Sequence, residues 1–206
     1  MRIKICGLFR DEDIDYVNEA RPDYAGFVFA ASKRQVSTPL AQYLRFRLAD
    51  DIIPVGVFIN APIAEVAALY HNGVISIAQL HGSEDESYIT QLKKICAVNN
   101  KYAQFKVIKV IKGDELKNKI PATGADYYLV DSGAGTGKSF DWELLGSKKF
   151  SKPWFLAGGV NLKNIKLAMA LNPFAVDISS GAETDGIKDR EKVLQLISTV
   201  RKGNIQ

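Results

Sequence analysis

Eight short apolar runs alternate with helix-like segments along this chain of 206 residues, and this alternation constrains the fold more than any other feature. The runs are rich in β-branched residues and apolar on both faces, which is typical of strands buried in a parallel sheet. Strict alternation of strand and helix implies right-handed crossovers between parallel strands. The predicted strands are Arg2–Gly7, Tyr24–Phe29, Ile53–Ile59, Ile75–Leu80, Phe105–Ile111, Tyr127–Val130, Trp154–Ala157 and Phe174–Ile178.

The segments between the strands have the apolar spacing of helices. Eight strand–helix units match a closed (β/α)8 barrel, the TIM barrel of the α/β class, with an eight-stranded parallel sheet. A doubly wound open sheet is the alternative, and the near-regular units without a long insertion favour the barrel. No linker divides the chain, so residues 1–206 are expected to form a single domain. The predicted helices are Asp11–Ala20, Pro39–Ala49, Ala61–His71, Asp85–Val98, Asp114–Ile120, Asp141–Leu145, Leu162–Leu171 and Asp189–Arg201.

Composition limits the cellular compartments and the classes of partner that we expect. The net charge is +4, and no basic block interleaves with aromatic residues, so nucleic acid is a disfavoured partner. No apolar run approaches the roughly 18 residues of a membrane span, and the sequence opens on a charged strand instead of a signal peptide. Two cysteines, Cys6 and Cys96, do not make a disulfide framework. We therefore expect a cytoplasmic protein with no membrane partner.

The loops after the last two predicted strands carry the most specific signal for a ligand. In a (β/α)8 barrel the carboxyl ends of all the strands meet on one face, where ligands bind. Glycines and small residues let backbone N–H groups approach an anion closely, and a phosphate often lies between these two loops, beside a short extra helix. Each glycine pair alone is equally explained by a tight turn, but two such loops together favour a phosphate site. The candidate binding residues here are Gly158, Gly159, Asp177, Ser179, Ser180 and Gly181.

The candidates for chemistry are Cys6, at the end of the first strand, and Asp131, at the end of the sixth. A thiol and a carboxyl group on one barrel face can act as general base and general acid. A thiol that acts as a base needs a pKa lowered by a nearby cation or helix terminus, and strand alternation points Lys4 the same way as Cys6. Alone, a cysteine is more often a core residue, and Asp131 is equally interpreted as a helix cap or ion-pair partner.

Three further side chains are candidates for binding. Arg34, after the second strand, has a fork of donors suited to a carboxylate or phosphate. Gln79 and His81 end the fourth strand, and His81 is a candidate acid, base or hydrogen-bond donor. The two histidines lack metal-ligand spacing, so no metal is expected. The segment 135–138 (Gly-Thr-Gly-Lys) lacks the full P-loop spacing and is interpreted as a loop over the site.

A set of short segments, spread over essentially the whole chain, forms a specific combination, although no single segment is specific. The segments are Lys4-Ile5-Cys6-Gly7, Gly26-Phe27-Val28-Phe29, Ser32-Lys33-Arg34, Val55-Gly56-Val57-Phe58, Gln79-Leu80-His81-Gly82, Gly135-Thr136-Gly137, Phe140-Asp141-Trp142, Leu156-Ala157-Gly158-Gly159, the run 175–181, Gly186 and Lys188-Asp189. In this order they resemble the phosphoribosylanthranilate isomerases of tryptophan biosynthesis.

The resemblance implies an Amadori rearrangement, an aldose-to-ketose isomerisation that uses neither a cofactor nor a metal. It implies that Asp131 protonates the ribose ring oxygen and that Cys6 removes the C2 proton of the ring-opened Schiff base. It further implies that Arg34 holds the anthranilate carboxylate and that the glycine loops hold the phosphate. The expected partner is thus a small phosphorylated substrate, and the protein is expected to be a monomer or homodimer.

Two departures and three alternatives accompany the resemblance. The segment Leu8-Phe9-Arg10 replaces a region where the family has a short hydroxyl or amide residue, and Ala182 stands where the family tends to have valine. A histidine-pathway isomerase would need an aspartate in place of Cys6, and an indoleglycerol-phosphate synthase would need a lysine-and-glutamate set. A phospholigand-binding module without chemistry is disfavoured by the intact pair Cys6 and Asp131.

Overall fold

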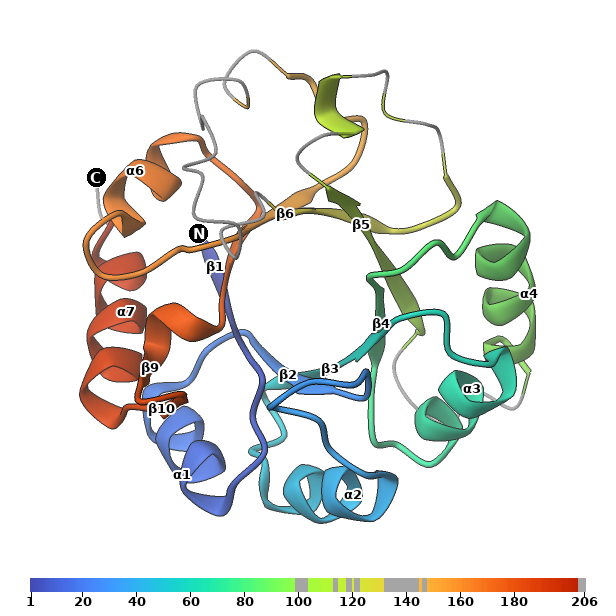
Figure 1. Cartoon of the computed structure of the whole chain (residues 1–206), viewed down its shortest axis with the longest axis horizontal. Coiled ribbons are helices and arrows are strands. Elements are labelled where there is room, and N and C mark those ends of the chain that lie inside the picture. Colours follow the sequence, from blue (N-terminus) through green and yellow to red (C-terminus); the bar gives the residue numbers. More distant parts are fainter. Residues whose placement is uncertain are drawn as a thin grey trace.

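Parallel strands close into a barrel, as the alternation predicts (Figure 1). The computed structural model describes residues 1–98, 104–112, 115–117, 120, 123–131, 145 and 148–203. The barrel strands are β1 (Arg2–Cys6), β2 (Tyr24–Val28), β3 (Ile53–Phe58), β4 (Ile77–Leu80), β5 (Lys106–Lys112), β6 (Tyr127–Asp131), β7 (Trp154–Ala157) and β8 (Ala175–Ile178). Each strand pairs with the next in sequence, and β8 pairs with β1 through the register Ile5 to Ile178, which completes the closed sheet.

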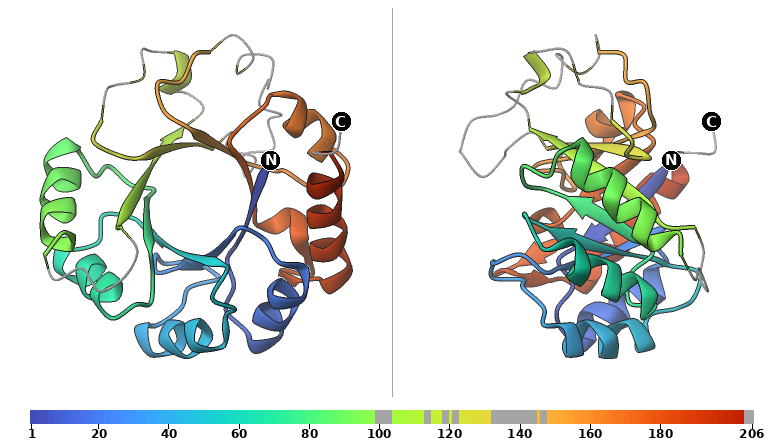
Figure 2. Two further views of the ribbon diagram at one scale, coloured as in Figure 1. Left: turned by 180° about the vertical axis from the view of Figure 1, so that it is seen from behind. Right: turned by 90° about the vertical axis from the view of Figure 1, so that its right-hand side faces the viewer.

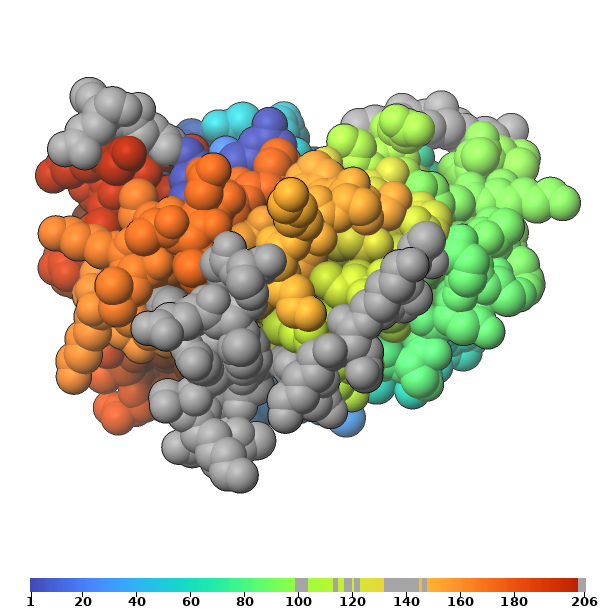
Figure 3. Space-filling view, turned by 90° about the horizontal axis from the view of Figure 1, so that it is seen from above, coloured from blue at the N-terminus to red at the C-terminus, as the bar shows by residue number. Residues whose placement is uncertain are grey.

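Helices surround the barrel on its outside, and their order around it follows the sequence (Figure 2). In the space-filling view from above, the carboxyl-terminal part of the chain, in orange and red, lies on the opposite side from the green middle part (Figure 3). The main helices are α1 (Asp11–Ala20), α2 (Thr38–Arg47), α3 (Ile63–His71), α4 (Glu86–Cys96), α6 (Ile165–Ala170) and α7 (Arg190–Lys202). The smaller elements are the 3-10 turns η1 (Glu115–Lys117) and η3 (Ser180–Ala182) and an antiparallel ribbon of β9 (Glu183–Thr184) and β10 (Ile187–Lys188). No helix of the described part is long and apolar enough to cross a membrane.

Several helices begin later in the structure than predicted, and a side-chain cap accounts for this in α4. The Asp85 carboxylate accepts a hydrogen bond from the Tyr88 backbone N–H at 2.8 Å, so α4 begins one residue after the predicted start. The helix α3 begins after Pro62 and not at Ala61, without a side-chain cap. Within the predicted helix 114–120 the described residues form only the 3-10 turn η1, and the predicted helix 141–145 falls almost wholly outside the described residues.

The buried apolar residues form two separate cores. The larger one lies between the strands and the surrounding helices and includes Ile3, Ile5 and Leu44. The smaller one fills the barrel interior at the amino ends of the strands, where the Phe155 ring contacts the rings of Tyr24 at 5.4 Å and Tyr127 at 5.6 Å. This aromatic plug closes one end of the barrel interior and leaves the carboxyl ends of the strands to line a cavity.

Candidate active site

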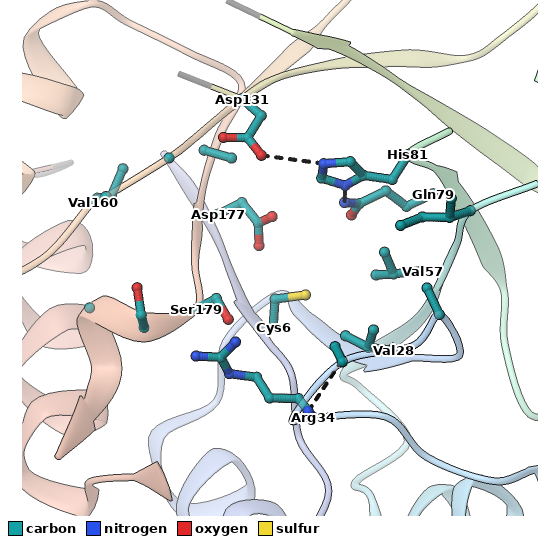
Figure 4. Close-up of a pocket in the computed structure, with 18 of the residues that line it drawn as sticks. Cys6, Val28, Arg34, Val57, Gln79, His81, Asp131, Val160, Asp177 and Ser179 are labelled. Carbon is teal, nitrogen blue, oxygen red and sulfur yellow. Dashed lines mark hydrogen bonds and ion pairs between the residues drawn. The ribbon is translucent and has the colours of Figure 1, made fainter. Parts of the chain in front are cut away.

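A cavity of about 440 Å³ opens at the carboxyl ends of the barrel strands. Every site residue predicted from the sequence lines it, although these residues come from six strands and the loops that follow them (Figure 4). Its lining also includes an apolar wall of Val28, Val57 and Ile59. The predicted residues that lie together here are Cys6, Arg34, Gln79, His81, Asp131, Gly158, Gly159, Asp177, Ser179, Ser180 and Gly181.

Cys6 is the last residue of β1, and its side chain lies at the cavity with only 7% of the residue exposed. The neighbouring strand makes room for it, because a Cβ on Gly26 would lie 2.8 Å from the Cys6 Sγ. Both cysteines of the chain are free thiols in the structure. Burial raises the pKa of Cys96 to about 12, which leaves that second thiol inert at neutral pH.

Lys4 and Asp177 form a buried ion pair beside Cys6. The Lys4 Nζ donates to the Asp177 Oδ1 at 2.9 Å, and the Lys4 side chain has no exposed surface. Burial alone would lower the pKa of Lys4, but the charge of Asp177 and the hydrogen bonds with Asp177 and Cys6 outweigh burial and raise it, so Lys4 stays protonated. The cation that strand alternation predicts beside Cys6 is therefore present.

The balance of effects on Cys6 differs from the lowered pKa that a base thiol is expected to need. Burial raises the pKa of the Cys6 thiol above 9.0, the Lys4 ammonium opposes this, and the Asp177 carboxylate adds to it. Cys6 is consequently mostly protonated at neutral pH. The ammonium groups of Lys4 and Lys188 limit the rise in the pKa of Cys6, but they do not offset the whole cost of burying a thiolate.

Asp131 ends β6 and faces the cavity from a different side than Cys6 (Figure 4). Its Oδ2 lies 3.3 Å from the Nε2 of His81, and the His81 Nδ1 lies 3.4 Å from the Gln79 Nε2. The buried Gln79 Oε1 has no hydrogen-bond partner among the described residues. A buried carbonyl oxygen at a cavity wall is suited to accept a hydrogen bond from a hydroxyl group of a ligand.

The loops after β7 and β8 form a compact glycine-lined wall. Gly158 and Gly159 have φ values of 89° and 73°, which is backbone that side chains other than glycine rarely adopt. A Cβ on Gly181 would collide with the Val160 carbonyl oxygen, so the two loops touch because Gly181 lacks one. Side-chain amides of Asn161 and Asn164 donate to the Gly159 carbonyl at 2.8 and 3.0 Å and fix this loop.

Arg34 reaches the cavity through an ion pair that the sequence does not reveal. Its Nε and Nη2 donate to the two carboxylate oxygens of Glu183 at 2.7 and 2.6 Å. Glu183 also accepts from Lys188, and both of these residues are buried. Burial works against ionisation of Glu183, but hydrogen bonds from Arg34 and Lys188 hold the pKa of its carboxyl group below the ordinary value.

The unusual segment Leu8-Phe9-Arg10 has a structural explanation. Leu8 is fully buried, and the Asp13 carboxylate accepts from the Arg10 backbone N–H at 3.2 Å and from the Arg10 guanidinium at the start of α1. The Arg10 Nη2 also donates to the Lys188 carbonyl at 3.3 Å. None of the three residues is among the described residues that line the cavity. Ala182 is likewise fully buried and packs in the outer core.

The segment 135–138 and the matching run Phe140-Asp141-Trp142 lie outside the described residues. Within the described ranges, no group of three or more His, Cys, Asp and Glu side chains could hold a metal ion.

Comparison with known proteins gives one consistent result. Residues 3–199 match the family model described as N-(5'-phosphoribosyl)anthranilate (PRA) isomerase. The N-(5'-phosphoribosyl)anthranilate isomerase of Endomicrobium trichonymphae is 46% identical over 97% of this chain and 98% of its own length. The crystal structure of TrpF from Jonesia denitrificans superposes with a TM-score of 0.84, at 29% identity, and covers 100% of this chain and 98% of that one.

A second solved structure is that of a phosphoribosyl anthranilate isomerase in complex with reduced 1-(o-carboxyphenylamino)-1-deoxyribulose 5-phosphate. It superposes with a TM-score of 0.76 at 26% identity, and covers 98% of this chain and 99% of that chain. The ligand of that protein carries both a phosphate and a ring carboxylate.

Proposed function

Because the chain belongs to the N-(5'-phosphoribosyl)anthranilate isomerase family, we propose that its cavity performs the family's isomerisation with Cys6 as general base and Asp131 as general acid. The protein is an isomerase of tryptophan biosynthesis that interconverts an aldose and a ketose. The observation that carries the assignment is the placement of a thiol and a carboxyl group on separate sides of one cavity. These two groups can serve the two proton transfers that the reaction needs.

In the proposed first step, Asp131 donates a proton to the ribose ring oxygen, and the C1–O bond breaks as the anilino nitrogen lone pair forms a Schiff base. His81 lies 3.3 Å from the Asp131 carboxylate, so it orients that group and exchanges its proton. Cys6 then removes the proton from C2, and the electron pair moves through C1 to the nitrogen to give an enol-amine. Protonation at C1 and loss of the hydroxyl proton at C2 give the ketone. The sum is redox-neutral, so the proposal needs no oxidant or reductant.

Substrate binding is proposed to divide among three parts of the cavity. The glycine wall, Gly158, Gly159 and Ser179–Gly181, takes the phosphate, since its backbone allows close approach of an anion. Arg34 takes the ring carboxylate beside the apolar wall that packs against the aromatic ring. Gln79 and Asp177 also line the cavity, and they are proposed to bind the ribose hydroxyl groups.

Turnover of N-(5'-phosphoribosyl)anthranilate by Cys6→Ala and Asp131→Ala tests the assignment directly. A general acid or base contributes about 10² to 10⁴ in rate, so each variant is expected to lose activity by that order in kcat. Cys96→Ala is the matched control, since it removes a buried thiol far from the cavity lining and leaves kcat unchanged. Near wild-type kcat in a folded Cys6→Ala or Asp131→Ala variant would refute the corresponding role.

A further inference from the structure

The Arg34 guanidinium is held by a contact with Glu183. Its Nε and Nη2 donate to Glu183 Oε1 and Oε2 at 2.7 and 2.6 Å, which is a bidentate, charge-assisted contact. Such a contact sets the plane of the guanidinium as well as its position. Gly7 contributes as well, because a Cβ at that residue would collide with the Arg34 Cδ. Arg34 thus lies across the backbone of Gly7 in a single orientation.

The contact with Glu183 leaves the other edge of Arg34 available to a ligand. Glu183 occupies the edge formed by Nε and Nη2, while Nη1 makes no hydrogen bond to the described part of the chain. Nη1 and the second hydrogen of Nη2 form another planar pair of donors that suits a carboxylate. The Arg34 side chain lines the cavity and is 28% exposed. A ligand carboxylate can therefore bind without displacing Glu183.

Lys188 anchors Glu183 and connects it to the glycine wall. The Lys188 Nζ donates to Glu183 Oε1 and to the Ser179 carbonyl, the latter at 3.3 Å, and Lys188 is only 3% exposed. The pairing of Lys188 with Glu183 across the β9–β10 ribbon sets this contact. The Glu183 carboxylate is thus shared between two basic side chains, Arg34 and Lys188. Burial lowers the pKa of Lys188, and its hydrogen bond to Glu183 opposes that shift.

We propose that Glu183, held by Lys188, is a positioning residue that aligns Arg34 for the ring carboxylate of the substrate. The inference rests on the proposed role of Arg34 in binding that carboxylate. It assigns Glu183 no contact with substrate, because its oxygens are occupied by Arg34 and Lys188. Loss of Glu183 then weakens binding of a carboxylate at the cavity more than it weakens binding of the phosphate or ribose.

Binding of two ligands to two variants distinguishes a role of Glu183 in aligning Arg34 from a general structural role of Glu183. The first ligand is the reduced 1-(o-carboxyphenylamino)-1-deoxyribulose 5-phosphate, and the second is the same compound without the ring carboxylate. Glu183→Gln keeps the size of the side chain and removes its charge. The control is Glu19→Gln, since Glu19 makes a bidentate contact to Arg190 on the exposed surface, away from the cavity.

In Glu183→Gln, calorimetry is expected to give a Kd for the carboxylated ligand about tenfold higher than in the wild-type protein. The Kd of the ligand without carboxylate is expected to change by less than about twofold, because it makes no use of Arg34. In turnover, KM rises by a similar factor while kcat changes little, since the carboxylate is bound alike in ground and transition states. Glu19→Gln leaves both Kd values at wild-type level.

Equal weakening of both ligands in Glu183→Gln would overturn the proposal in favour of a structural role, and an unchanged Kd for both would overturn it outright. Glu183→Asp keeps the negative charge near Lys188, but its shorter side chain reaches less far toward Arg34. It is expected to raise the Kd of the carboxylated ligand more than that of the ligand without carboxylate. If Glu183→Gln does not fold, the selectivity in Glu183→Asp decides. If the wild-type protein binds both ligands equally, the proposed role of Arg34 fails instead, which is a distinct result.

Discussion

The two ends of the barrel interior are built from opposite kinds of side chain. At the amino ends of the strands, aromatic rings of Tyr24, Tyr127 and Phe155 pack edge to face in an apolar plug. Arg2 and Lys106 contact this plug at its rim, where they donate to the two tyrosine hydroxyl groups. At the carboxyl ends, the interior holds the buried charges of Lys4 and Asp177. Burying charges costs free energy unless they are paired and hydrogen-bonded. The plug and the outer core provide apolar burial that offsets this cost, and the charged end carries the chemistry.

The largest expected effect is a loss of stability, without loss of activity, on substitution of a residue in the plug. Phe155→Ala removes a fully buried ring from the plug and should lower the free energy of unfolding by about 3–5 kcal/mol. Activity per folded molecule should stay within about twofold of wild type, because the residue lies away from the cavity. Urea unfolding and kcat at a temperature where the variant is folded measure the two effects. A loss of kcat comparable to that of Cys6→Ala would show that the two ends are not separable.

Arg34→Met tests the charged end with a smaller expected effect. The substitution keeps a long apolar side chain but removes the donors for a carboxylate, so KM should rise about tenfold with little change in kcat. Lys33→Met, in the same exposed loop, is the matched control and should leave KM unaltered. An unchanged KM in Arg34→Met would reassign this arginine to a purely structural role with Glu183.

Lys4→Met tests whether the buried pair tunes Cys6, and its expected effect is a shift in pH dependence. Lys4 lowers the pKa of Cys6, so its removal should move the alkaline rise of kcat/KM to higher pH. Lys93→Met is the control, because it removes a partly exposed ion pair outside the cavity. In that pair the Lys93 Nζ lies 3.0 Å from the Asp126 Oδ2. A Lys4→Met profile that coincides with wild type, in a folded variant, would contradict the tuning role.

Sequence patterns predicted the parts of this molecule that depend on local chemistry. The eight strands and the convergence of Cys6, Asp131 and Arg34 on one face follow from hydrophobic periodicity and from the topology of a parallel barrel. Glycine positions in the loops after β7 and β8 were informative because backbone near φ 80° and close loop contacts demand glycine.

The long-range ion pairs were not predictable from the sequence. Arg34 and Glu183 are 149 residues apart. The sequence contains many other Asp and Glu residues, and nothing in it singles out Glu183 as the partner of Arg34. Glu84 is a similar case: its buried carboxylate accepts from the backbone of Asn60 at 2.6 Å and of Gly82 at 2.9 Å, which fixes the loop next to His81. The direction of the Cys6 pKa also needed the structure, since burial and neighbouring charges act in opposite senses.

The most direct test of Cys6 as the base compares the titration of its thiol with the pH dependence of catalysis. Burial raises the pKa of Cys6 above 9.0, so the thiolate forms only as the pH rises through that higher value. In a Cys96→Ala background, the rate of alkylation of Cys6 by iodoacetamide and kcat/KM of the free enzyme should rise with pH in parallel, with one shared apparent pKa. A kcat/KM that stays flat while the Cys6 thiol titrates would contradict the assignment.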